Sequence, residues 1–114
     1  MKKVCAGVVT GMFIVLVLLS FRNAYADEYD KGKSLFENKC QICHGANGKG
    51  DGPAAGALNP RPSNFTDPKF WQGDAVKKIE DTLRKGKGAM PAFNFSQDEV
   101  KSIVDYLSHA FKKE

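Results

Sequence analysis

The chain has 114 residues and a formal net charge of +4 at pH 7, with 42% hydrophobic and 26% charged residues. Three of its 17 basic residues, Lys2, Lys3 and Arg22, lie in the apolar amino-terminal region, so the rest of the chain is close to neutral. This balance excludes the strongly basic surface expected of a nucleic-acid-binding protein. A chain of this length forms one small domain, which needs a cofactor or a cross-link in addition to its core.

Residues 1–26 have the order of a cleavable secretory signal. A basic pair precedes an apolar run from Val4 to Leu19, and Ala24-Tyr25-Ala26 supplies the small residues of a cleavage site. The apolar run is shorter than the roughly 20 residues that a membrane span needs. We therefore predict that the signal is removed together with Cys5, leaving a periplasmic domain of residues 27–114. An uncleaved membrane anchor is the alternative.

Two segments open the predicted domain. Tyr29 to Cys40 reads as a short amphipathic helix with Leu35 and Phe36 on its apolar side, and Gly32 would let another backbone approach closely. Residues 45–68 are rich in Gly, Pro, Asn and Asp without a periodic apolar pattern, which predicts a long ordered loop. A loop of this length in a small domain is expected to wrap a cofactor.

Two further helices are predicted downstream. Asp74 caps the first, which runs to about Arg84 and ends at Gly86. Residues 86–93 form a second loop. The final helix starts with the capping box Ser96 and Glu99. Its apolar stripe consists of Val100, Ile103, Val104, Leu107, Ala110 and Phe111. Because no segment shows the alternation of a strand, the predicted fold class is all-α.

The segment Cys40-Gln41-Ile42-Cys43-His44 carries the chemistry. Positions i, i+3 and i+4 of a helix share one face, so both thiols and the imidazole point the same way. This spacing is the attachment motif of haem c. The two cysteines form thioether bonds to the porphyrin edge, and the imidazole ligates the iron. A thioredoxin-like redox pair would need a βαβ context, and a zinc site would need a fourth ligand, for which His109 is the candidate. A plain disulfide leaves His44 unexplained.

Met90 is the predicted second axial ligand. It is the one methionine in residues 27–114, and Pro91 favours an extended backbone that presents its side chain. A thioether is a soft donor that favours ferrous iron and raises the reduction potential. The rival ligand, His109, lies beside polar Ser108 near the chain end, which indicates a surface residue.

These motifs together resemble class I cytochromes c, especially small bacterial periplasmic monohaem proteins. The resemblance covers the predicted domain through Gly32, Phe36, Cys40–Gly45, Met90-Pro91-x-Phe93 and the last helix with Ile103, Tyr106 and Leu107. It implies a cytochrome c fold of three to five helices wrapped around one covalently bound haem c. It also implies that Gly32 and Phe36 pack against Ile103 and Tyr106.

Further haem contacts are implied by the same resemblance. A proline carbonyl is expected to accept a hydrogen bond from the His44 nitrogen that is not on iron; Pro62 is the prediction and Pro60 the alternative. Trp71, with Arg61 and Asn64, is a candidate to hydrogen-bond the haem propionates. A core tryptophan and a solvated arginine are the competing interpretations.

The implied function is a monomeric carrier of one electron at a time between redox partners of a respiratory chain, without catalytic residues or enzyme activity of its own. Lys39, Lys49, Lys85 and Lys87 flank the cofactor segments and could steer a partner. Membrane contact is expected only through partners or an uncleaved signal. The alternatives are a ligand-binding or peroxidase-like haem protein with a labile Met90, or a membrane-anchored subunit of a larger oxidoreductase.

Overall fold

The computed structural model describes residues 2–113, with side chains for residues 7–20 and 25–113. It contains four α-helices and two 3-10 helices. In chain order these are α1 (Lys2–Lys39), α2 (Gln41–His44), η1 (Ala55–Ala57), η2 (Pro68–Trp71), α3 (Ala75–Lys85) and α4 (Gln97–Phe111). One isolated backbone bridge joins Lys87 and Met90, and no strand occurs within residues 2–113. The all-α prediction is confirmed.

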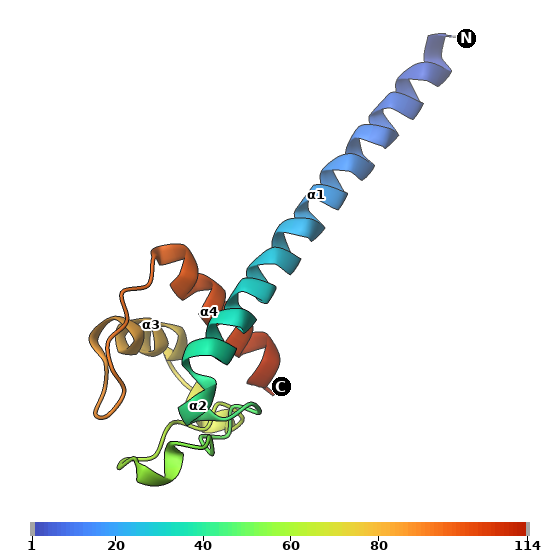
Figure 1. Cartoon of the computed structure of the whole chain (residues 1–114). Coiled ribbons are helices and arrows are strands. Elements are labelled where there is room, and N and C mark those ends of the chain that lie inside the picture. Colours follow the sequence, from blue (N-terminus) through green and yellow to red (C-terminus); the bar gives the residue numbers. More distant parts are fainter. Residues whose placement is uncertain (1, 114) are drawn as a thin grey trace.

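Helix α1 continues without a break through the predicted cleavage site. Its amino-terminal part extends away from the other elements, and its last turns lie against α4 (Figure 1). The large apolar side chains from Val8 to Leu19 are 40–69% exposed. Gly7–Lys39 is the one segment in the described part of the chain that is long and apolar enough to cross a membrane, a test that signal sequences also pass. The side chains of Lys2, Lys3, Cys5 and Ala24 lie outside the described residues, so cleavage after residue 26 stays a prediction.

Helices α1 and α4 cross at Gly32. A Cβ added there would collide with the Ser102 carbonyl and would lie 2.9 Å from Tyr106 Cβ. Glycine inside a helix costs about 1 kcal/mol relative to alanine, and here it lets the two backbones touch. One turn later Phe36 is 1% exposed, with its ring centroid 5.4 Å from that of Tyr106. The predicted crossing is confirmed, with Ser102 as the nearest backbone to Gly32.

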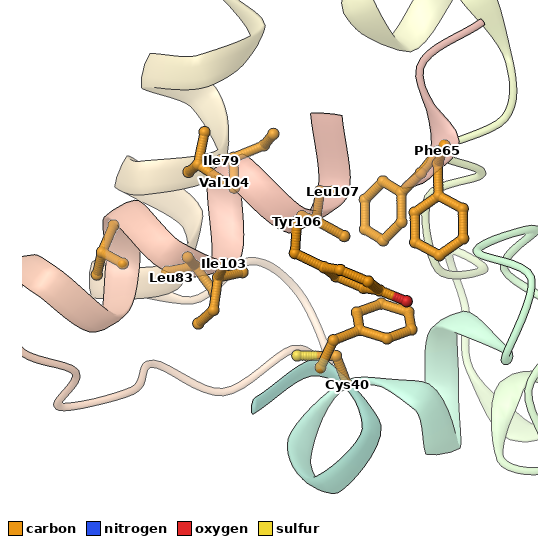
Figure 2. Close-up of a cluster of buried hydrophobic side chains, with 11 residues drawn as sticks. Cys40, Phe65, Ile79, Leu83, Ile103, Val104, Tyr106 and Leu107 are labelled. Carbon is orange, nitrogen blue, oxygen red and sulfur yellow. The ribbon is translucent and has the colours of Figure 1, made fainter. Parts of the chain in front are cut away.

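The core is built from residues of several elements and loops. Figure 2 shows Cys40 directed into the same cluster as Ile103, Tyr106 and Leu107 of α4. The buried members of this cluster are Phe36, Cys40, Phe65, Ile79, Leu83, Val100, Ile103, Val104, Tyr106, Leu107 and Phe111. The attachment motif therefore begins inside the packed core, because Cys40 is buried there together with Phe65 of the long loop.

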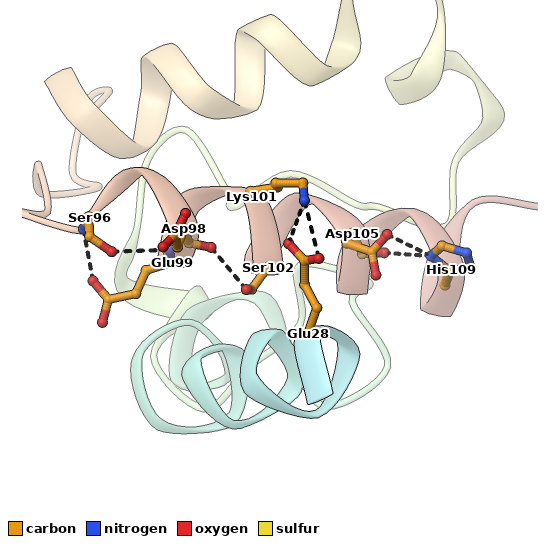
Figure 3. A network of polar contacts seen from close by, with 8 residues as sticks. All are labelled: Glu28, Ser96, Asp98, Glu99, Lys101, Ser102, Asp105 and His109. Carbon is orange, nitrogen blue, oxygen red and sulfur yellow. Dashed lines mark hydrogen bonds and ion pairs between the residues drawn. The ribbon is translucent and has the colours of Figure 1, made fainter. Parts of the chain in front are cut away.

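The predicted amino-terminal cap is present in α4 but not in α3. Ser96 Oγ accepts from the Glu99 N–H at 3.2 Å and Glu99 Oε2 accepts from the Ser96 N–H at 2.8 Å, which confirms the capping box (Figure 3). Helix α3 follows Asp74 and ends at Gly86, as predicted. The capping role of Asp74 is wrong, however, because in the described chain its side chain makes no capping hydrogen bond. Its backbone ψ of 58° differs from the extended 165° that orients the Ser96 hydroxyl.

Candidate cofactor site

A cavity of about 910 Å³ lies beside the core. Cofactor sites commonly occupy roughly 300–1,000 Å³. Cys40, Cys43 and His44 line it together with Met90, although Met90 is far from them in the sequence. Its apolar wall consists of Phe36, Ile79, Leu83, Phe93, Ile103 and Leu107, among others. The structure therefore brings the four predicted cofactor ligands to one largely apolar cavity.

The three residues of the attachment motif share one helical turn. The Cys40 carbonyl accepts from the N–H groups of Cys43 at 3.1 Å and His44 at 2.9 Å. This geometry gives the i, i+3, i+4 arrangement that directs both sulfurs and the imidazole to one side. Both thiols are free, Cys40 buried and Cys43 half-buried. The positions fit a group held by two thioether bonds and one imidazole.

The carboxyl end of α2 is held by the glycine-rich loop that follows it. The last carbonyls of a helix have no partner inside the helix. Here the loop supplies N–H donors at 2.8–3.1 Å: Gly50 to the His44 carbonyl, Gly52 to Cys43 and Ala54 to Ile42. A Cβ added at Gly52 would collide with the Ile42 carbonyl. The sequence predicted an ordered loop but not this role, for which the repeated glycines were the available signal.

His44 is held on two sides. Its Nδ1 lies 3.2 Å from the Ser63 carbonyl oxygen, and its ring stacks on Phe65 with centroids 4.6 Å apart and planes 17° apart. Burial lowers the pKa of His44, and the Ser63 contact opposes that shift. A neutral imidazole with Nδ1–H donating to a carbonyl leaves Nε2 free for a metal ion.

The acceptor for His44 corrects the prediction for Pro62. The Ser63 carbonyl, one residue later, takes the position expected for a proline. The Pro62 carbonyl instead faces Gly50, where an added Cβ would collide with it. Pro62 and the alternative Pro60 both line the cavity, so their contact with a cofactor stays a prediction.

The buried Cys40 thiol is poorly suited to thiolate chemistry. Burial, with a smaller contribution from the charge of Cys43, raises the pKa of Cys40 to about 11. Catalytic and redox-active cysteines have lowered thiol pKa values instead. His109, the candidate fourth ligand of the alternative zinc site, is on the surface as expected: its Nδ1 lies 2.9 Å from the Asp105 carbonyl and its side chain is 62% exposed. Among the described residues no group of three or more His, Cys, Asp and Glu could hold a metal ion.

Met90 lines the cavity from a tight turn. The backbone N–H and carbonyl groups of Lys87 and Met90 exchange two hydrogen bonds of 3.0 Å. Beyond the turn, the Phe93 N–H donates to the Leu83 carbonyl at 2.8 Å and ties the loop to α3. At its start, Gly86 has φ 71°, and a Cβ there would lie 2.7 Å from the Met90 carbonyl oxygen. Met90 is thus held at the cavity wall by its own loop.

The predicted propionate donors are only partly near the cavity. Arg61 lines it, but Trp71 does not appear in the lining formed by the described residues. The Trp71 Nε1 donates to the Phe65 carbonyl at 2.7 Å, and cofactor binding by Trp71 stays a prediction. The Asn64 side chain stabilises its own loop, because its Oδ1 accepts hydrogen bonds from the N–H and hydroxyl groups of Thr66. Lys69 and Lys78, which the sequence did not single out, line the cavity.

Comparisons with known proteins agree with this geometry. The family described as cytochrome c oxidase, cbb3-type, subunit III matches residues 27–107. Cytochrome c-551 of Halorhodospira halochloris is 34% identical over 85 residues, which cover 67% of this chain and 92% of that protein. Cytochrome c6 of Gloeothece citriformis is 29% identical over 118 residues, which cover 99% of this chain and 98% of that protein.

Larger proteins contain a similar segment. The thiosulfate dehydrogenase of Psychrobacter arcticus is 32% identical over 83 residues, which cover 70% of this chain and 25% of that protein. The oxidase subunit CcoP of Azospirillum brasilense is 28% identical over 94 residues, which cover 81% of this chain and 32% of that protein. The chain thus spans a quarter to a third of these two relatives.

Proposed function

The chain belongs to the cytochrome c family, and from this premise we propose that it is a periplasmic carrier of single electrons between redox proteins. The family brings one covalently bound haem c, which fits the two free thiols and the cavity of about 910 Å³. When bound, the haem iron supplies a ferric–ferrous couple that accepts and releases one electron. No catalytic residue is proposed.

Each side chain of the site has a separate task in this proposal. Cys40 and Cys43 hold the cofactor covalently, so it stays bound in both oxidation states. His44 ligates the iron through Nε2 while its Nδ1–H donates to the Ser63 carbonyl, 3.2 Å away, which makes the imidazole a stronger donor. Met90, which lines the same cavity, would supply a thioether ligand, a soft donor that raises the potential. The apolar lining excludes water from both ligands.

The observation that carries the proposal is the convergence of Met90 with the Cys40–His44 motif on one cavity. Intact-mass measurement of the denatured protein tests it. We expect a mass higher by one haem, with the haem retained in acidified organic solvent because thioether bonds survive denaturation. Haem that extracts into the solvent would contradict covalent attachment.

The charges around the cavity support docking of an acidic redox partner. Five basic residues line it: Lys39, Arg61, Lys69, Lys78 and Lys87. Among the described residues of the lining, Asp81 is the one acidic side chain. This local excess of positive charge contrasts with the near-neutral domain and would speed encounter with a negative surface. The rate of electron exchange with an acidic partner should fall as ionic strength rises.

Export is part of the same proposal. The exposed apolar helix segment from Val8 to Leu19 needs either removal or a lipid environment. Removal after Ala26 would begin the mature helix with Asp27, Glu28 and Asp30, and acidic side chains stabilise the first turn of a helix. Glu28 also pairs with Lys101 of α4 at 3.1 Å (Figure 3). Sequencing of the protein from a periplasmic extract should start at Asp27, whereas recovery with an intact start in the membrane fraction would favour an anchored subunit.

A further inference from the structure

Phe65 is the aromatic neighbour of His44. The two rings are nearly parallel, 17° apart, at a centroid distance of 4.6 Å. The Ser63 carbonyl lies 3.2 Å from Nδ1 at the edge of the same imidazole. A hydrogen bond to one ring nitrogen fixes the direction of that nitrogen but permits the ring plane to turn about it. A ring stacked on the face opposes that rotation.

Phe65 is itself held from several directions. Its N–H donates to the Gly48 carbonyl at 2.7 Å, and its carbonyl accepts from Trp71 Nε1 at 2.7 Å. Its side chain is buried at 7% exposure. The surrounding rings are Phe36, Phe70 and Phe111, with centroids 6.4, 5.0 and 6.1 Å away. The stacked ring therefore has little freedom to move, and the indole of Trp71 contributes to this restraint.

We propose that Phe65 is a positioning residue that fixes the plane of the His44 imidazole and keeps water from its face, and thereby contributes to the reduction potential of the iron. This inference rests on the proposed ligation by His44. Loss of the Phe65 ring would give the imidazole several orientations and would admit water to the Ser63 hydrogen bond. A wetter ligand environment stabilises the more highly charged ferric state, so the potential would fall.

The experiment uses the full holoprotein. Electron paramagnetic resonance of the frozen oxidised protein reports ligand orientation, and a redox titration gives the potential. The unmutated protein should show one narrow low-spin species. Phe65→Leu should broaden or split that signal and lower the potential, whereas Phe65→Tyr, which preserves the stacked ring, should restore both. Phe95→Leu is the control, because its ring stacks on Phe93 and has no ring contact with Phe65 or His44 among the described residues.

Each outcome bears on the inference. A Phe65→Leu protein with the signal and potential of the unmutated protein, or a Phe95→Leu protein with the same changes as Phe65→Leu, would overturn it. If Phe65→Leu yields no holoprotein, the unmutated protein decides, since several low-spin species in its spectrum would show that the ring is not fixed. A protein without covalent haem or without histidine ligation would instead overturn the proposed function, independently of Phe65.

Discussion

The two sides of the cavity are supported in different ways. On the side of α2, three loop N–H groups bind the carbonyls of Ile42, Cys43 and His44, and the Ser63 carbonyl with the Phe65 ring holds the imidazole. On the side of Met90, this residue lies on a turn closed by Lys87 and anchored beyond it by the Phe93 N–H. The His44 side includes contacts with Ser63 and Phe65, about twenty positions away, whereas the backbone hydrogen bonds given for the Met90 turn join residues at most ten positions apart. We expect the His44 side to resist change and the Met90 side to open first.

Removal of both thiols should have the largest effect. Cys40→Ala with Cys43→Ala leaves no atom that can form a thioether, so covalent haem should be lost completely, as measured by intact mass. Cys5→Ala is the control, because that residue leaves with the predicted signal. Covalent haem in the double variant, or its loss in Cys5→Ala, would contradict the account.

Met90→Ala should alter the iron without detaching the haem. Loss of the soft thioether donor should lower the potential, abolish the weak red-end absorption band of the oxidised protein and admit cyanide or azide. Met90→His is the comparison: an imidazole keeps six ligands on the iron but stabilises the ferric state, so the potential should fall while the site stays closed. Unchanged potential in Met90→Ala would show that Met90 is not a ligand.

Gly52→Ala tests the support of α2. The added Cβ would collide with the Ile42 carbonyl, and overpacking of this kind costs about 1–3 kcal/mol. The melting temperature of the holoprotein should fall accordingly. Gly56→Ala is the matched control, since among the described residues nothing lies within 4 Å of the Cβ it would add. Equal melting temperatures for the two variants would remove the proposed role of the loop.

Gly86→Ala should act selectively on the Met90 side. Its φ of 71° and ψ of 172° lie in a backbone region that is nearly restricted to glycine, at a cost of about 1–3 kcal/mol for alanine. The added Cβ would also lie 2.7 Å from the Met90 carbonyl oxygen. Gly73→Ala also places a side chain at a positive φ, 67°, but without that contact. Azide should therefore bind faster to the oxidised Gly86→Ala protein than to Gly73→Ala. Equal rates would show that Gly86 does not hold the Met90 loop.

Local sequence predicted the elements whose cause is local. The Ser96–Glu99 capping box and the Cys40–His44 turn depend on residues a few positions apart, and both are present as predicted. Asp74 shows the limit of such signals: it occupies the capping position, but the preceding loop sets its backbone at a ψ that does not support capping.

Contacts made by the long loop could not be predicted in the same way. Its path decides whether Pro62 or Ser63 presents a carbonyl to His44, and that path depends on the Gly48 and Gly50 contacts with residues more than ten positions away. The Trp71 hydrogen bond to Phe65 and the Phe65 stack on His44 arise from the same path. The composition of residues 45–68 predicted a loop that wraps a cofactor. Without a periodic apolar pattern, it could not predict which atoms of the loop face the cavity.

Carbon monoxide binding by the reduced, unmutated holoprotein tests the central claim most directly. If Met90 occupies the iron opposite His44, the reduced protein should bind carbon monoxide slowly or not at all, and its visible spectrum should stay unchanged over the mixing time. Rapid binding with an immediate spectral change would show an open coordination position at rest. That result would contradict the electron-carrier proposal and would favour a ligand-binding haem protein.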